Sequence, residues 1–211
     1  MLNLKLYRML AVMFVLVFGG VKFAKAQCGD VYFGMGTDTD SSNGQIVQTY
    51  GPPTNYSTPE MTGLFGKFGA GYMFKPTLGF GGEYNFRFSQ GSYAGLNYRP
   101  KFYDLNVIWM PLGNSRKVVP EFQGGIGGVN LSFYYSSQYC DLFAGCTTSN
   151  SYLEGSSHFQ THLSAGLRFY VKGGMFVRPQ FDVHYVNNFF QFGRGWVPEY
   201  GVVIGYTFGR Q

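Results

Sequence analysis

Apolar and polar side chains alternate one by one along much of this chain. In residues 78–88, Leu78, Phe80 and Tyr84 would lie on one face of an extended strand, and Glu83 and Arg87 on the other. A period of two is typical of a β-strand whose two faces meet different surroundings. The same pattern predicts strands at 31–35, 63–74, 78–88, 101–111, 118–130, 158–171, 175–186 and 198–208.

The connections between these segments are alternately short and long. Residues 75–77, 112–117 and 172–174 are short connections, and residues 37–62, 89–100, 131–157 and 187–197 are long ones. Tilted strands of about ten residues cross a bilayer, and membrane barrels join them by short periplasmic turns and longer extracellular loops. We therefore expect an all-β, antiparallel, up-and-down transmembrane β-barrel of eight strands, with both termini in the periplasm and four loops outside. A further hairpin at 45–50 would raise the number of strands to ten.

The composition also favours strands over helices. The 211 residues include 31 Gly, 22 Phe and 17 Tyr. Aromatic residues are enriched in strands, whereas glycine is a poor helix former. Beyond residue 26, Gly, Asn, Arg or Glu interrupts every apolar run, so we predict no spanning helix there.

The first 26 residues are organised like a secretory signal peptide. Lys5 and Arg8 precede an apolar stretch at 9–21, and Ala24 and Ala26 supply small residues before a cleavage point. We expect residues 1–26 to be removed and residues 27–211 to form one outer-membrane β-barrel domain. A retained anchor and lipidation of Cys28 are the alternatives.

Removing this segment changes what the charge implies. The whole chain has a formal net charge of +5, but without the four basic residues of the first 26 it holds 12 basic against 11 acidic residues. No basic surface then remains that would suggest nucleic acid as a partner.

The charged residues of the strands fall on the face opposite to the aromatic one. A charge facing lipid at the middle of a bilayer costs about 2 to 4 kcal/mol, so the charged face is expected to line the lumen. A soluble barrel of the lipocalin type would have the opposite orientation. The predicted lumenal charge network consists of Lys67, Glu83, Arg87, Asp104, Glu121, Arg168, Arg178, Asp182 and Glu199.

Two stretches near the C-terminal end resemble a known family. The sequence from residue 166 through the turn at 172–174 to residue 181, and the ending at 201–211, are similar to the last strands of small outer-membrane β-barrels of the OmpA transmembrane-domain and OmpX type. The resemblance implies a location in the outer membrane, among lipid and lipopolysaccharide. It also implies insertion by the barrel-assembly machinery, which reads a C-terminal aromatic residue such as Phe208. That group is functionally mixed, so the resemblance implies no activity.

The three histidines are the first candidates for chemistry. His158 and His162 share a face, but residues four apart on a strand are about 13 Å apart along it, which is too far to share a metal ion. His184 can approach only one of them, and we see no cysteine or carboxylate cluster beside it. We therefore predict lumenal polar residues, with no metal site and no cofactor.

A second candidate is an acyl hydrolase. The sequence 162–166, His-Leu-Ser-Ala-Gly, is similar to the His-x-Ser-Asn-Ala-Gly signature of lipid A 3-O-deacylases, which use serine as nucleophile and histidine as base. Here the Asn is absent, Phe176 stands where the orienting Glu is expected, and the strand phase turns His162 and Ser164 inward. A lipid A-modifying hydrolase is thus an alternative function and not the first choice.

The long connections carry the remaining candidates. Cys140 and Cys146 lie in one loop bound for an oxidising compartment, so we predict a disulfide between them and leave Cys28 free or paired between molecules. The loops are also aromatic, with Phe133, Tyr134, Tyr135, Tyr139, Phe143, Phe189, Phe190, Phe192 and Trp196. These residues serve either an extracellular ligand or an interfacial girdle, and the girdle is favoured beside the strands. The predicted function is a non-enzymatic outer-membrane barrel with a structural or surface-interaction role. A narrow pore is disfavoured because eight strands leave room only for side chains.

Overall fold

The computed structural model describes residues 28–38, 60–93, 96–141, 145–189, 192 and 195–210. The predicted signal peptide at 1–26 and the further hairpin at 45–50 lie outside the described residues. No described helix is long and apolar enough to span a membrane. The described residues form nine strands, which are β1 (Cys28–Asp38), β2 (Gly63–Lys75), β3 (Leu78–Arg87), β4 (Gly91–Tyr93), β5 (Leu96–Trp109), β6 (Val118–Asp141), β7 (Gly145–Lys172), β8 (Met175–Val186) and β9 (Trp196–Phe208).

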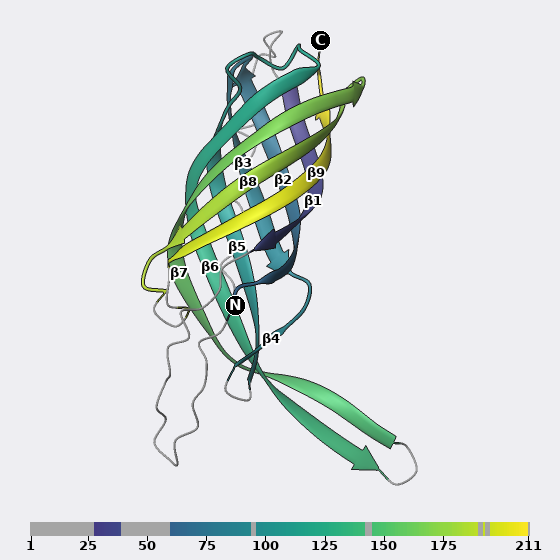
Figure 1. Ribbon diagram of the computed structural model, residues 1–211, viewed down its shortest axis with the longest axis vertical. Coiled ribbons are helices and arrows are strands. Elements are labelled where there is room, and N and C mark those ends of the chain that lie inside the picture. The colour runs from purple at the N-terminus through teal and green to yellow at the C-terminus, as the bar shows by residue number, and fades with distance from the viewer. Residues whose placement is uncertain are drawn as a thin grey trace, which may run out of the picture.

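The strands close into a barrel in which sequence neighbours pair (Figure 1). All pairings are antiparallel, and β9 returns to pair with β1, from Gly29 opposite Phe208 to Asp38 opposite Glu199. Among the described residues, eight strands complete the ring, because β3 pairs directly with β5 while the short β4 lies beside β5 at the loop end. The predicted eight-stranded up-and-down barrel is confirmed.

The two faces of each strand differ as the alternation predicts. On β5, Leu105 and Val107 point outward and are 73% and 56% exposed, whereas Asp104 and Asn106 between them are 4% and 3% exposed. Toward the middle of the ring strands the outward residues are mostly apolar or aromatic, and the buried polar residues face the lumen. This is the reverse of a lipocalin-type barrel, and it is the arrangement that a lipid exterior requires.

The connection expected at residues 131–157 is not an irregular loop. Strands β6 and β7 contain 24 and 28 residues and continue to pair beyond the barrel, as far as Asp141 opposite Gly145. Figure 1 shows this hairpin, in green, projecting away from the barrel. Its Thr and Tyr residues form strands well, but its sequence lacks the apolar alternation that identifies a membrane strand.

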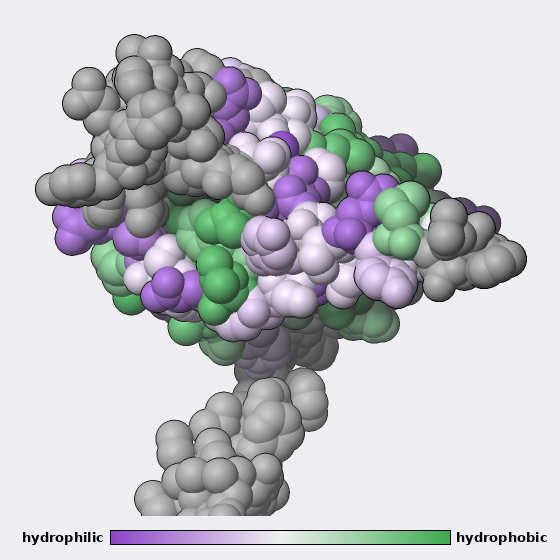
Figure 2. Space-filling model, turned by 90° about the horizontal axis from the view of Figure 1, so that it is seen from below, coloured by the Kyte–Doolittle hydropathy of each residue, from purple (hydrophilic) through white to green (hydrophobic). Residues whose placement is uncertain are grey.

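The lumen has three layers. Buried apolar side chains fill it at the end of the short turns: Cys28, Tyr32, Met73, Ile108, Met110, Val119, Tyr170, Phe176 and Val203. A second apolar cluster fills it at the loop end: Met61, Phe65, Tyr98, Phe102, Val129, Leu131, Val186, Phe189, Phe192 and Val197. The charged residues lie between these two clusters. Figure 2 shows the loop end of the molecule, where hydrophilic and near-neutral residues make up much of the face, with a hydrophobic patch among them and further hydrophobic residues along the flanks.

Candidate functional site

The polar middle layer is the main concentration of reactive groups in the described chain. Eight of the nine residues expected in the lumenal charge network are buried there, with exposures of 4% or less. Burying a charge is costly unless a partner of opposite charge and hydrogen bonds compensate it. The contacts of each charge therefore decide what this layer can do.

Toward the turn end, two arginines share one carboxylate. Arg168 Nε donates to Glu121 Oε2 at 2.7 Å, and Arg178 donates to the other oxygen of Glu121. Arg168 Nη1 also donates to Asp30 Oδ2 at 2.6 Å, and its guanidinium lies 4.0 Å from the centre of the Phe176 ring. Asp30 was missed from the sequence because the first strand was expected to begin at Val31; extending the same alternation back by one residue would have included it.

Toward the loop end, one lysine is surrounded by three carboxylates. Lys67 Nζ contacts Asp182 and lies 3.0 Å from Glu83 Oε1 and 3.4 Å from Glu199 Oε1. The hydroxyl of Tyr32 donates to Glu83 Oε2 at 2.8 Å. The four residues of this ion-pair group come from β2, β3, β8 and β9, so the group connects opposite sides of the barrel.

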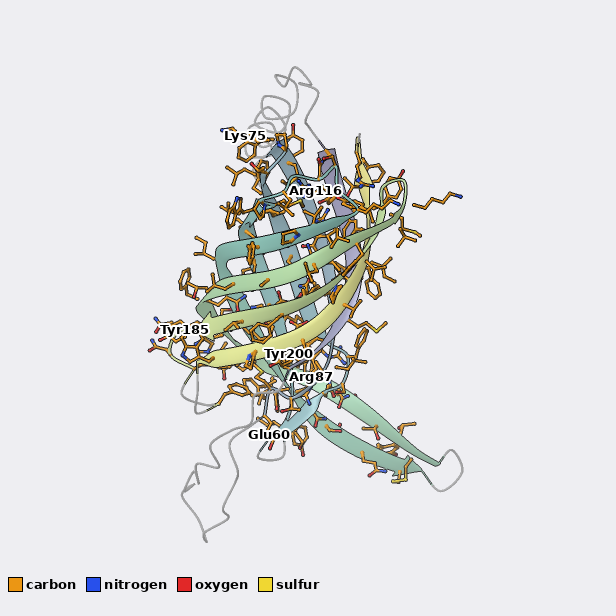
Figure 3. All side chains as sticks on the ribbon, turned by 45° about the horizontal axis from the view of Figure 1, so that its top comes forward. Glu60, Lys75, Arg87, Arg116, Tyr185 and Tyr200 are labelled. Carbon is orange, nitrogen blue, oxygen red and sulfur yellow. A yellow bond between two sulfur atoms is a disulfide. The ribbon has the colours of Figure 1, made fainter. Side chains whose placement is uncertain are left out.

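Arg87 is a correction to the predicted network. It is the last residue of β3, and its guanidinium donates to the carbonyl oxygen of Glu60 at 3.3 Å and to the hydroxyl of Tyr98 at 3.5 Å. Figure 3 shows Arg87 and Glu60 together at the loop end, far from Lys75 and Arg116 at the other end. Arg87 lies at the loop-end edge of the barrel. The apolar loop-end cluster therefore separates it from the charged layer.

Two of the histidines lie closer to each other and to carboxylates than the sequence suggested. His162 and His184 are directly opposite each other on β7 and β8, both fully buried, and their rings stack with centroids 4.7 Å apart. The expectation that no carboxylate cluster lies beside them is wrong. Asp182 Oδ1 lies 3.4 Å from His162 Nε2, and His184 lies within 4.0 Å of carboxylate oxygens of both Asp104 and Glu199.

The histidine pair depends on a β-bulge as well as on the turn between β7 and β8. The turn is residues 173–174, and pairing from it without a shift would place Tyr185 opposite His162; the register shift between Tyr170 and Lys172 brings His184 there instead. The third histidine, His158, is only half-buried and packs its ring 5.7 Å from that of Phe189 at the loop end.

The hydrolase motif does not form a lipid-facing site. His162 and Ser164 both face the lumen, with exposures of 0% and 8%. His162 Nδ1 is hydrogen bonded to Asn106 Oδ1 at 3.0 Å, and Phe176 is buried in the apolar cluster at the turn end. In the described residues this serine and histidine are therefore enclosed, away from the surface where an acyl chain would lie.

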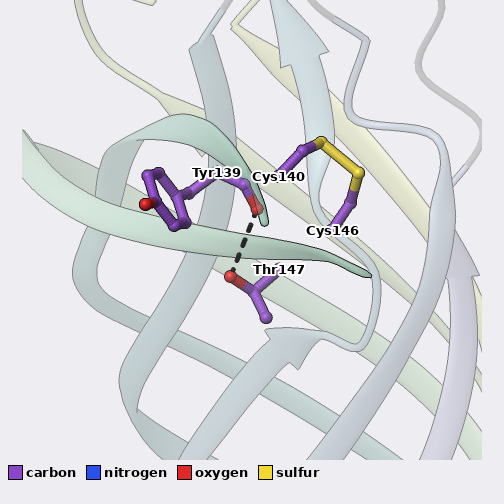
Figure 4. The surroundings of a disulfide bond; sticks show 4 residues. All are labelled: Tyr139, Cys140, Cys146 and Thr147. Atoms are coloured by element: carbon purple, nitrogen blue, oxygen red, sulfur yellow. Dashed lines mark hydrogen bonds between the residues drawn. A yellow bond between two sulfur atoms is a disulfide. The ribbon is translucent and has the colours of Figure 1, made fainter. Parts of the chain in front are cut away.

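The protruding hairpin is closed at its tip by a disulfide between Cys140 and Cys146, whose Cα atoms are 3.9 Å apart (Figure 4). Beside it, the hydroxyl of Thr147 donates to the carbonyl oxygen of Tyr139 at 3.4 Å. Cys28 is a free thiol buried at the turn end, with Asn114 Nδ2 2.9 Å from its sulfur. The two ends of the molecule thus hold cysteines in different chemical states.

Comparison with known proteins identifies the fold and nothing finer. No protein-family profile and no curated protein sequence matches this chain. Among solved structures, the chain is similar to a major outer membrane protein of Thermus thermophilus (12% identity, 85% of this chain and 99% of that one, TM-score 0.52). It is also similar to Neisserial surface protein A (13% identity, 87% and 97%, TM-score 0.51). A third is Ail, the attachment invasion locus protein of Yersinia pestis, in complex with the heparin analogue sucrose octasulfate (13% identity, 86% and 99%, TM-score 0.50).

These similarities place the chain in a structural class. Its fold is that of a small outer-membrane β-barrel protein. Fold does not determine function, which must be argued from the chain's own residues.

Proposed function

We propose that this chain is an integral outer-membrane protein whose role is to present the β6–β7 hairpin at the cell surface. In this proposal residues 1–26 are a cleaved signal peptide, residues 27–211 form the barrel, the short turns and both termini face the periplasm, and four loops face outward. The apolar exterior of the ring supports insertion in a membrane, because exposed Leu105, Val107 and Ile204 sit where lipid would contact them.

The length of the hairpin is the observation that carries the proposal. Strand β5 stops pairing with β6 at Tyr135, and β8 stops pairing with β7 at Gln160. Residues 136–141 therefore extend about 20 Å past the end of β5, at about 3.3 Å per residue. A strand pair of this length, closed by a disulfide, is a stiff structure held away from the membrane surface.

The surface of the hairpin is suited to a partner. Tyr135, Tyr139, Tyr152 and Leu153 are between 55% and 71% exposed. Tyrosine supplies a large contact area at a low cost in side-chain entropy and is common where proteins bind one another. Tyr139 lies four residues beyond Tyr135, the last residue of β6 that pairs with β5, so it stands clear of the barrel wall where an interfacial girdle would lie.

The edges of the hairpin favour one class of partner, an extended polypeptide. Within the described residues, 136–141 pair only with 145–150, and 151–158 pair only with β6, so the outer edge of each strand offers backbone groups that no third strand uses. Exposed edges invite strand addition, and lysine or proline normally blocks them. Residues 131–157 contain no Lys, Arg or Pro and include Asp141 and Glu154.

The same composition argues against a sulfated glycan. Ail was solved with sucrose octasulfate, but anion binding needs cationic side chains, and this hairpin has none. A pore is not supported either, because an apolar cluster fills the lumen at each end. The inward His162 and Ser164 give no support to lipid A hydrolysis.

The orientation is tested by epitope insertion on intact cells. An epitope placed between Asp141 and Gly145 should bind antibody without permeabilisation. The matched control is the same epitope at Gly173, in the turn at 172–174, which should be labelled only after the outer membrane is opened. Labelling of Gly173 on intact cells, or none at the hairpin, would refute the proposed orientation.

The binding role is tested with a shortened hairpin in which an Asn-Gly turn replaces residues 136–150. That change keeps Tyr135 paired with Leu96 and Ser151. A displayed library of random peptides, selected on cells carrying the natural barrel, should yield peptides that bind at least tenfold less to the shortened one. No enrichment, or heparin binding that depends on the hairpin, would contradict the proposal.

A further inference from the structure

The polar layer of the lumen contains more negative than positive charge. With Asp38 at the loop end of β1 set aside, the buried charged side chains of the described residues are three cations and six carboxylates. The cations are Lys67, Arg168 and Arg178, and the carboxylates are Asp30, Glu83, Asp104, Glu121, Asp182 and Glu199. An excess of buried negative charge is unfavourable unless a further cation compensates it.

Two of the three excess negative charges lie around Lys67, which three carboxylates share, and the third lies at Asp104. Asp30 and Glu121 contact Arg168, and Glu83, Asp182 and Glu199 surround Lys67. Among the described residues, Asp104 has no lysine or arginine within 4.0 Å. Gln160 Nε2 donates to its Oδ1 at 2.6 Å, and its Oδ2 makes no hydrogen bond.

A buried histidine faces this carboxylate without satisfying it. His184 is fully buried, and neither ring nitrogen has a hydrogen-bond partner among the described residues. Its Nδ1 is 4.0 Å from Asp104 Oδ2. A buried polar group that is aimed at another and left unbonded indicates that something belongs between them.

We propose that Asp104, His162 and His184 form a binding site for one divalent transition-metal ion of the zinc class. Their ligand atoms lie within 4.8 Å of one another. Any two ligands that are about 2.0–2.1 Å from a tetrahedral metal are about 3.3 Å apart. The 4.0 Å gap between His184 and Asp104 is too long for a hydrogen bond, and the two side chains would move together by about 0.7 Å to share an ion.

The ligand set selects the class of metal. Imidazole nitrogens with one carboxylate suit Zn²⁺ and related ions, whereas Ca²⁺ and Mg²⁺ prefer oxygen ligands alone. The hydrogen bond from Gln160 orients Asp104 as an outer-shell contact does in metal sites. A second grouping, Glu83, His162 and Asp182, is less suitable because Lys67 already contacts both of its carboxylates.

Within the described residues, the proposed site lies between the two apolar clusters of the lumen. We therefore expect the ion to enter while the barrel folds and to leave slowly afterwards. This site is separate from the hairpin, and the proposal does not depend on the hairpin's role.

The test measures metal retained after refolding. The purified barrel, with Cys28→Ser to remove the free thiol, is refolded in detergent with ZnCl₂, washed with EDTA and analysed by mass spectrometry for metals. We expect about one zinc per chain, and no retention of Ca²⁺ or Mg²⁺. Zinc during refolding should also raise the melting temperature, and Co²⁺ should give weak visible absorption bands of a site with nitrogen and oxygen ligands.

Matched variants locate the ion. His158 lies on β7, like His162, but outside the proposed site. The His158→Gln barrel should therefore retain as much zinc as the parent. Asp104→Asn and His184→Gln should retain less than a tenth of it, with circular dichroism showing that each is folded. The proposal is overturned if the parent retains no zinc at any pH from 6 to 8. That result would mean that protons supply the missing positive charge. Equal zinc in all variants also overturns it. If the variants do not fold, the parent's retention, melting shift and cobalt spectrum decide the question.

Discussion

Lys67 is the residue whose removal should most damage the barrel. Its ammonium is 1% exposed and contacts Glu83, Asp182 and Glu199. Lys67→Met keeps most of the side-chain volume and removes the charge. The three carboxylates, which come from β3, β8 and β9, would then be left without their shared cation in the sealed middle of the lumen.

The expected cost can be estimated from buried ion pairs in general. Removing one partner of a buried pair destabilises a protein by about 3 to 5 kcal/mol, because the other charge remains buried and uncompensated. Lys67 serves three carboxylates, so we expect Lys67→Met at the upper end of that range. Lys75 is exposed at the turn end, and Lys75→Met should change stability by about 0.5 kcal/mol or less.

The measurement is equilibrium unfolding by urea in lipid vesicles. The two tryptophans of the chain, Trp109 and Trp196, face outward with exposures of 51% and 56%, so their fluorescence reports on loss of the lipid contact. Adding Glu83→Gln to Lys67→Met removes one uncompensated charge and should restore part of the lost stability. A Lys67→Met barrel that is about as stable as the parent, or no recovery in the double variant, would refute this account of the lumen.

Three further predictions concern the wall, the hairpin and the lumen. Gly127→Ala would place a Cβ against the carbonyl oxygen of Tyr103 and should destabilise the barrel by about 1 to 3 kcal/mol in urea unfolding. The control is Gly124→Ala, whose Cβ would have Leu163 Cδ2 as its nearest neighbour at 3.5 Å and should not destabilise the barrel. Cys140→Ser with Cys146→Ser should lower the local stability of the hairpin by about 2 kcal/mol and speed its hydrogen exchange, and an altered midpoint for the whole barrel would show that the disulfide does more than close the tip. In planar bilayers the barrel should give no steady conductance, because the lumen is filled at both ends; well-defined channels would contradict the arrangement of the apolar clusters.

The strands could be predicted from the sequence because lipid imposes a strict demand on every second residue. Leu105 and Val107 must be apolar, and Asp104 and Asn106 between them cannot face outward, so both the position and the phase of β5 were clear. The extension of β6 and β7 was missed because that demand ends where the strands leave the membrane. Beyond Leu131, both faces tolerate serine and tyrosine, and the alternation disappears.

The site in the lumen was harder to predict, because it depends on register across several strands. The pairing of His162 with His184 depends on the two-residue turn at 173–174 and on the register shift beside it. The approach of Asp104 depends on the pairing of β5 with β6 and of β6 with β7, which the longer connections leave undetermined. The strand alternation also overstated the balance of charge, since it placed Arg87 among the carboxylates and, with the first strand begun at Val31, omitted Asp30.

The Lys67→Met prediction and the proposed metal site both concern the negative charge of the lumen, and measurements with and without zinc can distinguish them. Lys67 contacts Glu83, Asp182 and Glu199, whereas the proposed ion would neutralise Asp104, so the two cations serve different carboxylates. The two sites are nevertheless neighbours, because His162 Nε2 lies 3.4 Å from Asp182 Oδ1 and His184 Nε2 lies 3.7 Å from Glu199 Oε2, and neighbouring sites are coupled. Zinc should therefore reduce the cost of Lys67→Met without removing it, and the zinc-dependent rise in melting temperature should persist in Lys67→Met. A lysine effect that vanished once zinc was present would mean that the ion sits among the lysine's own carboxylates, with His162, Glu83 and Asp182 as its ligands.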